Sequence, residues 1–165
     1  MVIAEPNIIL HALIFSGNGL AALGAMFAIG ISGIAAAYAL QISGQSAIGA
    51  TTENEKLFGK FLVLDLMPQT QLIYGALGAI LIVLGIRRGD LTIEQGFICL
   101  SAGLAVGLTS ISAVFQGMLA ASSIGALARN EKIMGKLIII IVMTEIAALF
   151  GLLVAFMMLN FGGIL

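Results

Sequence analysis

Charged residues divide the chain into four long apolar runs. No Asp, Glu, Lys or Arg occurs in residues 6–52 or in residues 96–128. Short charged stretches separate the runs: "ENEKLFGK" at 53–60, "RRGDLTIEQ" at 87–95 and "RNEKIMGK" at 129–136. Because about 20 apolar residues are enough for a helix to cross the hydrocarbon core, each run is long enough to span a membrane. We expect an all-α membrane protein with four transmembrane helices, near residues 12–46, 58–85, 94–127 and 134–160.

The two halves of the chain repeat each other. "NEKLFGKF" at 54–61 matches "NEKIMGKL" at 130–137, an offset of 76 residues. The same offset aligns "AIGA" at 47–50 with "SIGA" at 123–126, and "IYG" at 73–75 with "LFG" at 149–151. This pattern indicates a duplicated helical hairpin, with the first copy at 1–89 and the second at 90–165. Two spans per copy give both copies the same orientation, which disfavours inverted-repeat transporters.

Composition agrees with a membrane protein. The chain is 61% hydrophobic and 9% charged, with a mean hydropathy of +1.18. A net charge of -1 offers no basic surface for nucleic acid. The single cysteine, Cys99, excludes a disulfide within the chain, and we read both Cys99 and His11 as structural. The first residues, "MVIAEPN", lack the positive region of a signal peptide, so we expect no cleaved leader.

Basic residues predict the orientation. Five of the seven flank the two intra-hairpin loops, and Arg87 and Arg88 lie at the connection between the hairpins. Because Lys and Arg accumulate on the cytoplasmic side, we expect cytoplasmic hairpin loops and both termini outside. The five are Lys56, Lys60, Arg129, Lys132 and Lys136.

Glu145 places a carboxylate inside the last apolar run. It follows Glu131 by 14 residues, and Gln116 precedes Asn130 by the same number. At 1.5 Å per residue both lie roughly 21 Å from the second hairpin turn, so they share one depth. A charge in hydrocarbon must be protonated, paired or bound to a cation, and no Lys or Arg lies at that depth. We infer that Glu145 reversibly binds an ion.

The second helix adds polar groups at the same level. The repeat offset aligns Glu145 with position 69, next to Thr70 and Gln71. Pro68 lacks an amide donor and tends to free a carbonyl one turn earlier. Tyr74 lies one turn beyond Thr70, where its hydroxyl can reach Glu145. Alternatively, the Tyr74 side chain only packs against its neighbours. One carboxylate among neutral oxygens suits a monovalent cation.

The roles of Gln116, Thr70 and Asp65 remain open at this stage. Gln116 or Thr70 alone can serve to hold helices together by hydrogen bonds. Asp65, the other acid within an apolar run, lies about 6 Å nearer the hairpin loop than position 69. It can neighbour an ion entry path or have a structural role.

Glycines crowd the first and third helices. Small residues let helices approach closely, and two such surfaces exceed what one chain needs. We therefore expect them to form the inner wall of a ring of identical subunits. The glycines are Gly17, Gly19, Gly24, Gly30, Gly33, Gly103, Gly107 and Gly117.

From about Ser16 onward the chain resembles the proteolipid c/K subunit of V-type (A/V-type) rotary ATPases, in its sodium-translocating form. The most specific matches are "LMPQTQLIYG" at 66–75, "FQG" at 115–117 and "MTEIAALFG" at 143–151. The resemblance implies a homo-oligomeric ring in membrane lipid, turning against a stator subunit that carries a basic residue and attached to a central-stalk subunit. It implies a Na+ site made of Glu145, Thr70, Gln71, Gln116 and the Met67 carbonyl, with Tyr74 hydrogen-bonded to the carboxylate. Gln69 and Leu40 replace the ligands in the first hairpin, so one ion per chain is expected, with no organic cofactor.

The chain has no GxxxxGK[ST] loop, so nucleotide hydrolysis is expected on other subunits and the chain is not an enzyme. Alternatives are the same rotor carrying H+, a small proton-coupled transporter, or a pore-forming or structural proteolipid. The parallel duplication and the absence of Trp argue against the small transporter.

Overall fold

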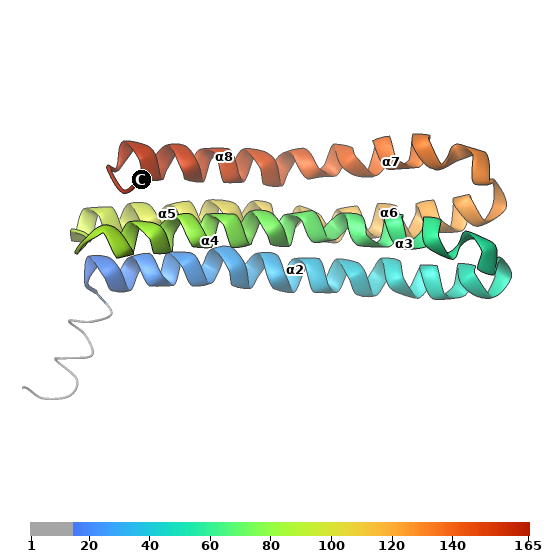
Figure 1. Cartoon of the computed structure of the whole chain (residues 1–165), viewed down its shortest axis with the longest axis horizontal. Coiled ribbons are helices and arrows are strands. Elements are labelled where there is room, and N and C mark those ends of the chain that lie inside the picture. Colours follow the sequence, from blue (N-terminus) through green and yellow to red (C-terminus); the bar gives the residue numbers. More distant parts are fainter. Residues whose placement is uncertain (1–14) are drawn as a thin grey trace, which may run out of the picture.

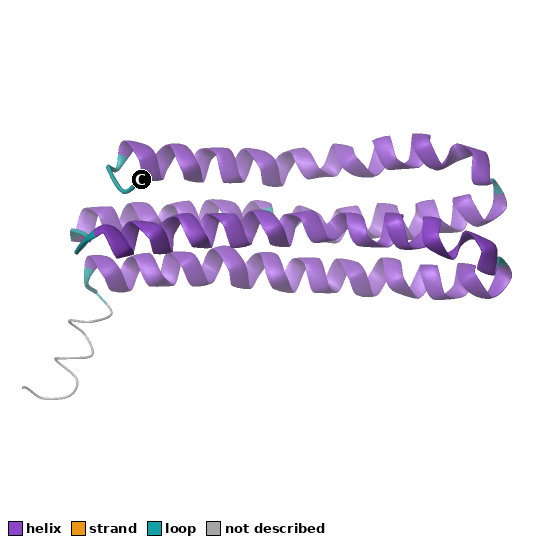
Figure 2. Cartoon of the chain, in the orientation of Figure 1, coloured by secondary structure: helices purple, strands orange, loops and turns teal. Residues whose placement is uncertain are grey.

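The structure is a computed structural model that describes residues 15–165. Within that range the chain is helical with no strand, and it contains four helices long and apolar enough to cross a membrane. They lie side by side, with short loops confined almost entirely to the ends (Figure 2). The predicted fold class is therefore confirmed. The four spans are Gly17–Glu53, Glu55–Arg88, Ile93–Arg129 and Glu131–Phe161.

Three of the four predicted helices agree with the structure within three residues at each end. The first prediction, 12–46, ends short of the observed helix. The helix begins at Gly17, where the Ser16 hydroxyl accepts from the Gly19 amide at 3.0 Å, and it continues to Glu53. In its last turns Thr51 donates to the Ala47 carbonyl at 2.7 Å, and the Asn54 amide donates to the Ala50 carbonyl at 2.9 Å. His11 and residues 12–14 lie outside the described residues.

The spans contain short 3-10 segments that interrupt regular helix. The first and third spans are α2 and the pair α5–α6, while the second and fourth each contain two α-helices and two 3-10 segments. In chain order the elements are α2 (Gly17–Glu53), η1 (Glu55–Leu57), α3 (Phe58–Leu66), η2 (Met67–Gln69), α4 (Thr70–Arg88), α5 (Ile93–Thr109), α6 (Ser112–Arg129), η3 (Glu131–Ile133), α7 (Met134–Val142), η4 (Met143–Glu145) and α8 (Ile146–Phe161).

The duplication is visible in these boundaries. Adding 76 to the ends of α2 gives the ends of the α5–α6 span, and adding 76 to the bounds of α3 and η2 gives those of α7 and η4. Both hairpin loops lie at one end of the bundle, and the inter-hairpin connection and the carboxyl end lie at the other (Figure 1). The second helix of each hairpin thus has its 3-10 break at the same place in the repeat, whereas the first helix is continuous in α2 and divided into α5 and α6 in the second hairpin.

Glycines join the two hairpins within the chain. A Cβ on Gly103 would lie 2.0 Å from the Gly24 carbonyl oxygen, and one on Gly117 would lie 2.6 Å from that of Ala39. Gly17 and Gly107 approach backbone equally closely. Within the chain, the two glycine faces meet each other between α2 and α5–α6. Their expected place in the inner wall of a ring stays a prediction. Gly30, by contrast, has no atom within 4 Å of its Cβ position.

Candidate ion-binding site

The helix breaks η2 and η4 bring two chain segments to the same level of the bundle. Pro68 is buried in η2, where its missing amide favours the tighter turn. No proline lies in η4; there Thr144 donates to the Ile141 carbonyl at 2.7 Å, and the Met143 amide points to carbonyls in the preceding turn. Glu145 is the last residue of η4, so the break sets its position.

A chain of hydrogen bonds links the second, third and fourth spans. The Thr70 hydroxyl approaches the Met67 carbonyl at 3.0 Å and Gln71 Oε1 at 3.3 Å. Gln71 Nε2 donates to Gln116 Oε1 at 2.8 Å, and Gln116 Nε2 donates to the Ile141 carbonyl at 3.3 Å. Both glutamines are fully buried. Thr70, Gln71 and Gln116, which were predicted to share one depth, thus lie in one hydrogen-bonded layer.

Tyr74 connects this layer to the carboxylate. Its hydroxyl donates to Glu145 Oε1 across the interface between α4 and η4, and both side chains are half-buried. Thr70 lies one turn before Tyr74 on α4, while Ile141 lies one turn before Glu145. The predicted Tyr74 contact is present. Glu145 also lies one turn beyond Ile141, whose carbonyl accepts from Gln116.

The structure adds residues that the sequence reasoning missed. The third span breaks between α5 and α6, where Ser110 donates to the Val106 carbonyl at 2.8 Å and approaches that of Gln71 at 3.5 Å. Within the described chain, the buried Ser112 hydroxyl has no hydrogen-bond partner. The cluster of Thr109, Ser110 and Ser112 in an otherwise apolar run was the available signal, since such side chains compete for helix carbonyls.

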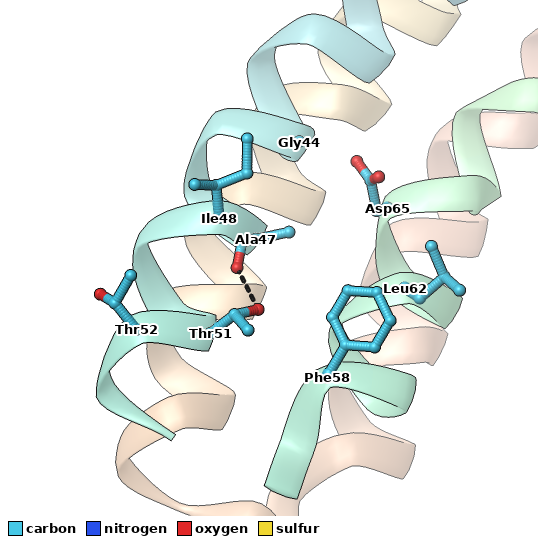
Figure 3. Close-up of a pocket in the computed structure, with 8 residues that line it drawn as sticks. All are labelled: Gly44, Ala47, Ile48, Thr51, Thr52, Phe58, Leu62 and Asp65. Atoms are coloured by element: carbon cyan, nitrogen blue, oxygen red, sulfur yellow. Dashed lines mark hydrogen bonds between the residues drawn. The ribbon is translucent and has the colours of Figure 1, made fainter. Parts of the chain in front are cut away.

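Asp65 lies apart from the layer. Its carboxylate accepts from the Ser43 hydroxyl at 2.6 Å, so it faces α2. It also lines a pocket of about 410 Å³ between α2 and α3, shown in Figure 3. The structure thus does not bring Asp65 together with Glu145.

The site combines a single acid with neutral oxygens. Hydroxyl, amide and carbonyl oxygens of Thr70, Gln71, Gln116 and Met67 lie in one hydrogen-bonded layer, and Tyr74, one turn beyond Thr70 on α4, donates to Glu145. Within residues 15–165, the only ion pair is Lys60–Glu131 near the hairpin loops, and no three His, Cys, Asp or Glu side chains gather. Hard cations take such oxygens as ligands, and each carbonyl oxygen has two lone pairs. The arrangement can therefore bind a proton or a small monovalent cation.

Comparison with known proteins identifies the family. The family model for the C subunit of ATP synthase matches twice, at residues 23–82 and 100–158, once in each hairpin. The chain belongs to this ATP synthase family of C subunits. Its duplicated form of the family's hairpin agrees with the resemblance to rotary-ATPase proteolipids seen in the sequence.

Relatives narrow the class within this family. The chain is 41% identical over 138 residues to "A-type ATP synthase subunit K" of Methanocaldococcus jannaschii, which covers 82% of the chain but 62% of that relative. It is 34% identical over 128 residues to "V-type sodium ATPase subunit K" of Enterococcus hirae, covering 77% of the chain and 81% of the relative. It is 28% identical over 136 residues to the human "V-type proton ATPase 16 kDa proteolipid", covering 82% and 87%. The predicted similarity to the A/V-type proteolipid subunits is confirmed. These proteolipids are not the catalytic subunits of the ATPase.

Proposed function

We propose that this chain is a rotor-ring subunit of an A/V-type rotary ATPase that carries Na+ across the membrane at Glu145. The observation that carries the proposal is the hydrogen-bonded oxygen layer beside Glu145, built from both hairpins. ATP hydrolysis or synthesis takes place on other subunits.

The ligand set favours Na+ over H+. A proton needs the carboxyl group and one or two hydrogen-bond partners, and Tyr74 already supplies one. Thr70, Gln71 and Gln116 add oxygens beyond that need, and the Met67 carbonyl lies beside the Thr70 hydroxyl. Bound Na+ would be held by Glu145 with these four oxygens, which suits a hard monovalent cation.

Neutralisation of Glu145 permits rotation. A charged carboxylate is costly against lipid, whereas a neutralised one can face it. At the stator, a basic residue of another subunit would compensate the charge and release the ion to an aqueous path. The central stalk would couple this rotation to the catalytic subunits. The basic residues flanking the hairpin loops support cytoplasmic loops and outer termini.

Proton transport by the same rotor is the second candidate. It is favoured by the Tyr74–Glu145 hydrogen bond, which can by itself hold a protonated carboxyl group. Relatives include one named for sodium and several named for protons, so their names support the rotor class and either ion.

Carbodiimide labelling of the purified protein separates the two ions. The reagent attacks protonated carboxyl groups, so Glu145 labels faster as the pH falls. We expect millimolar Na+ to protect Glu145 while K+ at equal ionic strength does not. Labelling of Glu145 that ignores Na+ would establish a proton site. Labelling of Asp65 with no labelling of Glu145 would show that the wrong carboxylate carries the ion.

A further inference from the structure

Asp65 is a buried acid that the proposed ion site does not use. It is the next-to-last residue of α3, and its carboxylate contacts the Ser43 hydroxyl of α2 at 2.6 Å. Ser43 is fully buried, and Asp65 is 8% exposed. Figure 3 shows the Asp65 side chain turned toward α2 at the level of Gly44. The contact therefore joins the end of α3 to α2.

This contact lies immediately before a proposed ligand. Met67, whose carbonyl is proposed to hold the ion, begins η2 two residues after Asp65. Pro68 follows and has no amide hydrogen, so it cannot donate to the Leu64 carbonyl as a helical residue would. The joint between α3 and η2 thus lacks a backbone hydrogen bond that would fix its geometry. Side-chain contacts at this joint therefore have a larger part in setting the direction of the Met67 carbonyl.

The second hairpin fixes its own helix break in a different way. There Thr144 donates to the Ile141 carbonyl at 2.7 Å, which is a hydrogen bond within the helix. The repeat offset aligns Thr144 with Pro68, which has no side-chain donor. It aligns Ile141 with Asp65. Asp65 thus supplies a polar contact in the hairpin whose break lacks the internal hydrogen bond.

Ser43 relates this contact to the rest of the proposed site. Its hydroxyl also lies 3.0 Å from the Ala39 carbonyl, one turn earlier on α2. That carbonyl lies against α6, because a Cβ on Gly117 would be 2.6 Å from it. Gly117 follows Gln116, the proposed ligand on α6. A short series of contacts thus runs from Asp65 through α2 to the backbone beside Gln116.

From these contacts we propose that Asp65 is a positioning residue of the ion site. Through Ser43 it fixes the end of α3 on α2, and so it sets the distance between the Met67 carbonyl and the Gln116 amide oxygen. Groups that orient the ligands of a metal ion raise its affinity without touching it. The proposal rests on the proposed sodium site and identifies a further residue on which the affinity of that site depends.

Sodium protection of Glu145 from carbodiimide measures the effect in the purified protein, with labelling read at Glu145 by mass spectrometry. Asp65→Leu and Ser43→Ala each remove the contact. We expect each to raise the protecting Na+ concentration by about 2- to 10-fold, the equivalent of one hydrogen bond. Asp65→Asn keeps a side chain that can form a hydrogen bond with Ser43, so it should have the parent value.

Ser46→Ala is the matched control. Ser46 lies about one turn from Ser43 on α2 and donates to the Ala121 carbonyl of α6 at 2.8 Å. Its loss also removes one hydrogen bond between helices, but one that does not involve α3. We expect Ser46→Ala to lower the midpoint of thermal unfolding, as Ser43→Ala does, and to leave the protecting Na+ concentration unchanged.

The Met67 carbonyl can also be observed on its own. Met67–Pro68 is the single Met-Pro sequence in the chain, so carbon-13 at methionine carbonyls and nitrogen-15 in proline give one coupled carbon signal. In solid-state NMR of the reconstituted protein, this signal should shift when Na+ is added. Without Na+, Asp65→Leu and Ser43→Ala should already move it. Asp65→Asn and Ser46→Ala should leave it in place.

The outcomes separate this proposal from the sodium site itself. Unchanged Na+ protection in both Asp65→Leu and Ser43→Ala would overturn the positioning role and leave the sodium site standing. A loss in Asp65→Asn as large as in Asp65→Leu would also overturn it, because the effect would then come from the charge. An equal rise in Ser46→Ala would assign the effect to general loosening of the helices. If Na+ does not protect the parent protein, the sodium proposal fails, and the Met67 signal then decides whether Asp65 positions the carbonyl.

Discussion

The first and second hairpins have matching span boundaries but different chemistry at matching positions. Each breaks its second helix into a 3-10 segment at the same place in the repeat, at η2 and η4. At the break the first hairpin has Gln69, whose amide donates to the Ala36 carbonyl at 3.2 Å, while the second has Glu145. The other pairs are Leu40 and Gln116, Thr70 and Ile146, Gln71 and Ala147, and Tyr74 and Phe150.

This difference supports one proposed ion site per chain and not two. The neutral oxygens lie on the second helix of the first hairpin, while the second hairpin has the acid and, on its first helix, the amide. Only the interface where α4 meets α6 and η4 unites both sets.

The largest effect is expected when the acid is made like its counterpart. Glu145→Gln gives the second hairpin the residue type found at Gln69, and removes the group that can neutralise a cation. We expect complete loss of ion transport and of carbodiimide labelling in the reconstituted complex. Gln69→Leu is the matched control and should keep transport, with a loss of about 0.5–1.5 kcal/mol in stability from its broken hydrogen bond. Transport surviving in Glu145→Gln would mean that another group carries the ion.

The close contact of Gly103 with Gly24 is the next difference between the hairpins to test by mutation. Gly103 of the second hairpin corresponds to Phe27 of the first, and a Cβ on Gly103 would lie 2.0 Å from the Gly24 oxygen. Gly103→Val should force α2 and α5 apart and cost about 1–3 kcal/mol or more, as overpacking does. Thermal unfolding in detergent should show a lower midpoint. Gly30→Val, at an open position, is the control; an equal loss in both variants would contradict close packing at Gly103.

Gln116→Leu tests the side-chain amide of Gln116. It gives the second hairpin the residue type that the first hairpin has at the matching position, Leu40. The change removes a proposed ion ligand and leaves the buried Gln71 amide donor without its partner, while the Ile141 carbonyl still accepts from Thr144. Lost partners of this kind cost about 1–3 kcal/mol, which corresponds to about 5- to 150-fold in affinity. The Na+ concentration that protects Glu145 from carbodiimide should rise by that factor. An unchanged value, with transport intact, would indicate a proton-carrying rotor.

Tyr74→Phe gives the first hairpin the residue of the second, and should have the smallest effect. It removes one hydroxyl donor to Glu145 and leaves the aromatic ring in place. A single hydrogen bond of about 0.5–1.5 kcal/mol predicts about a 2- to 10-fold weaker Na+ protection. Phe150→Tyr is the control and should leave protection unchanged. A loss as large as that of Glu145→Gln would make the hydroxyl a principal ligand.

Sequence reasoning recovered the spans, the duplication and the polar layer because each depends on a regular spacing. Apolar runs have the length of a membrane, and equal distances from a turn give equal depth. Gln116 and Gln71 could therefore be placed together from their spacing, with Glu145 predicted at the same depth.

What the sequence did not predict depends on tertiary contacts. Helix α2 ends at Glu53, the first charged residue after the uncharged run, whereas the prediction ended at residue 46. Spacing shows that two helix faces carry small residues, but not that these faces meet each other within the chain. The break at Ser110 and the Asp65–Ser43 contact required knowledge of which face of each helix is covered.

Sodium stoichiometry tests most directly whether one ion site per chain spans the two hairpins. Radioactive Na+ bound to the purified protein should saturate at one ion per chain, and Glu145→Gln should abolish all of it while Gln69→Leu retains it. Two ions per chain, or binding that persists in Glu145→Gln, would contradict a single site completed by both hairpins.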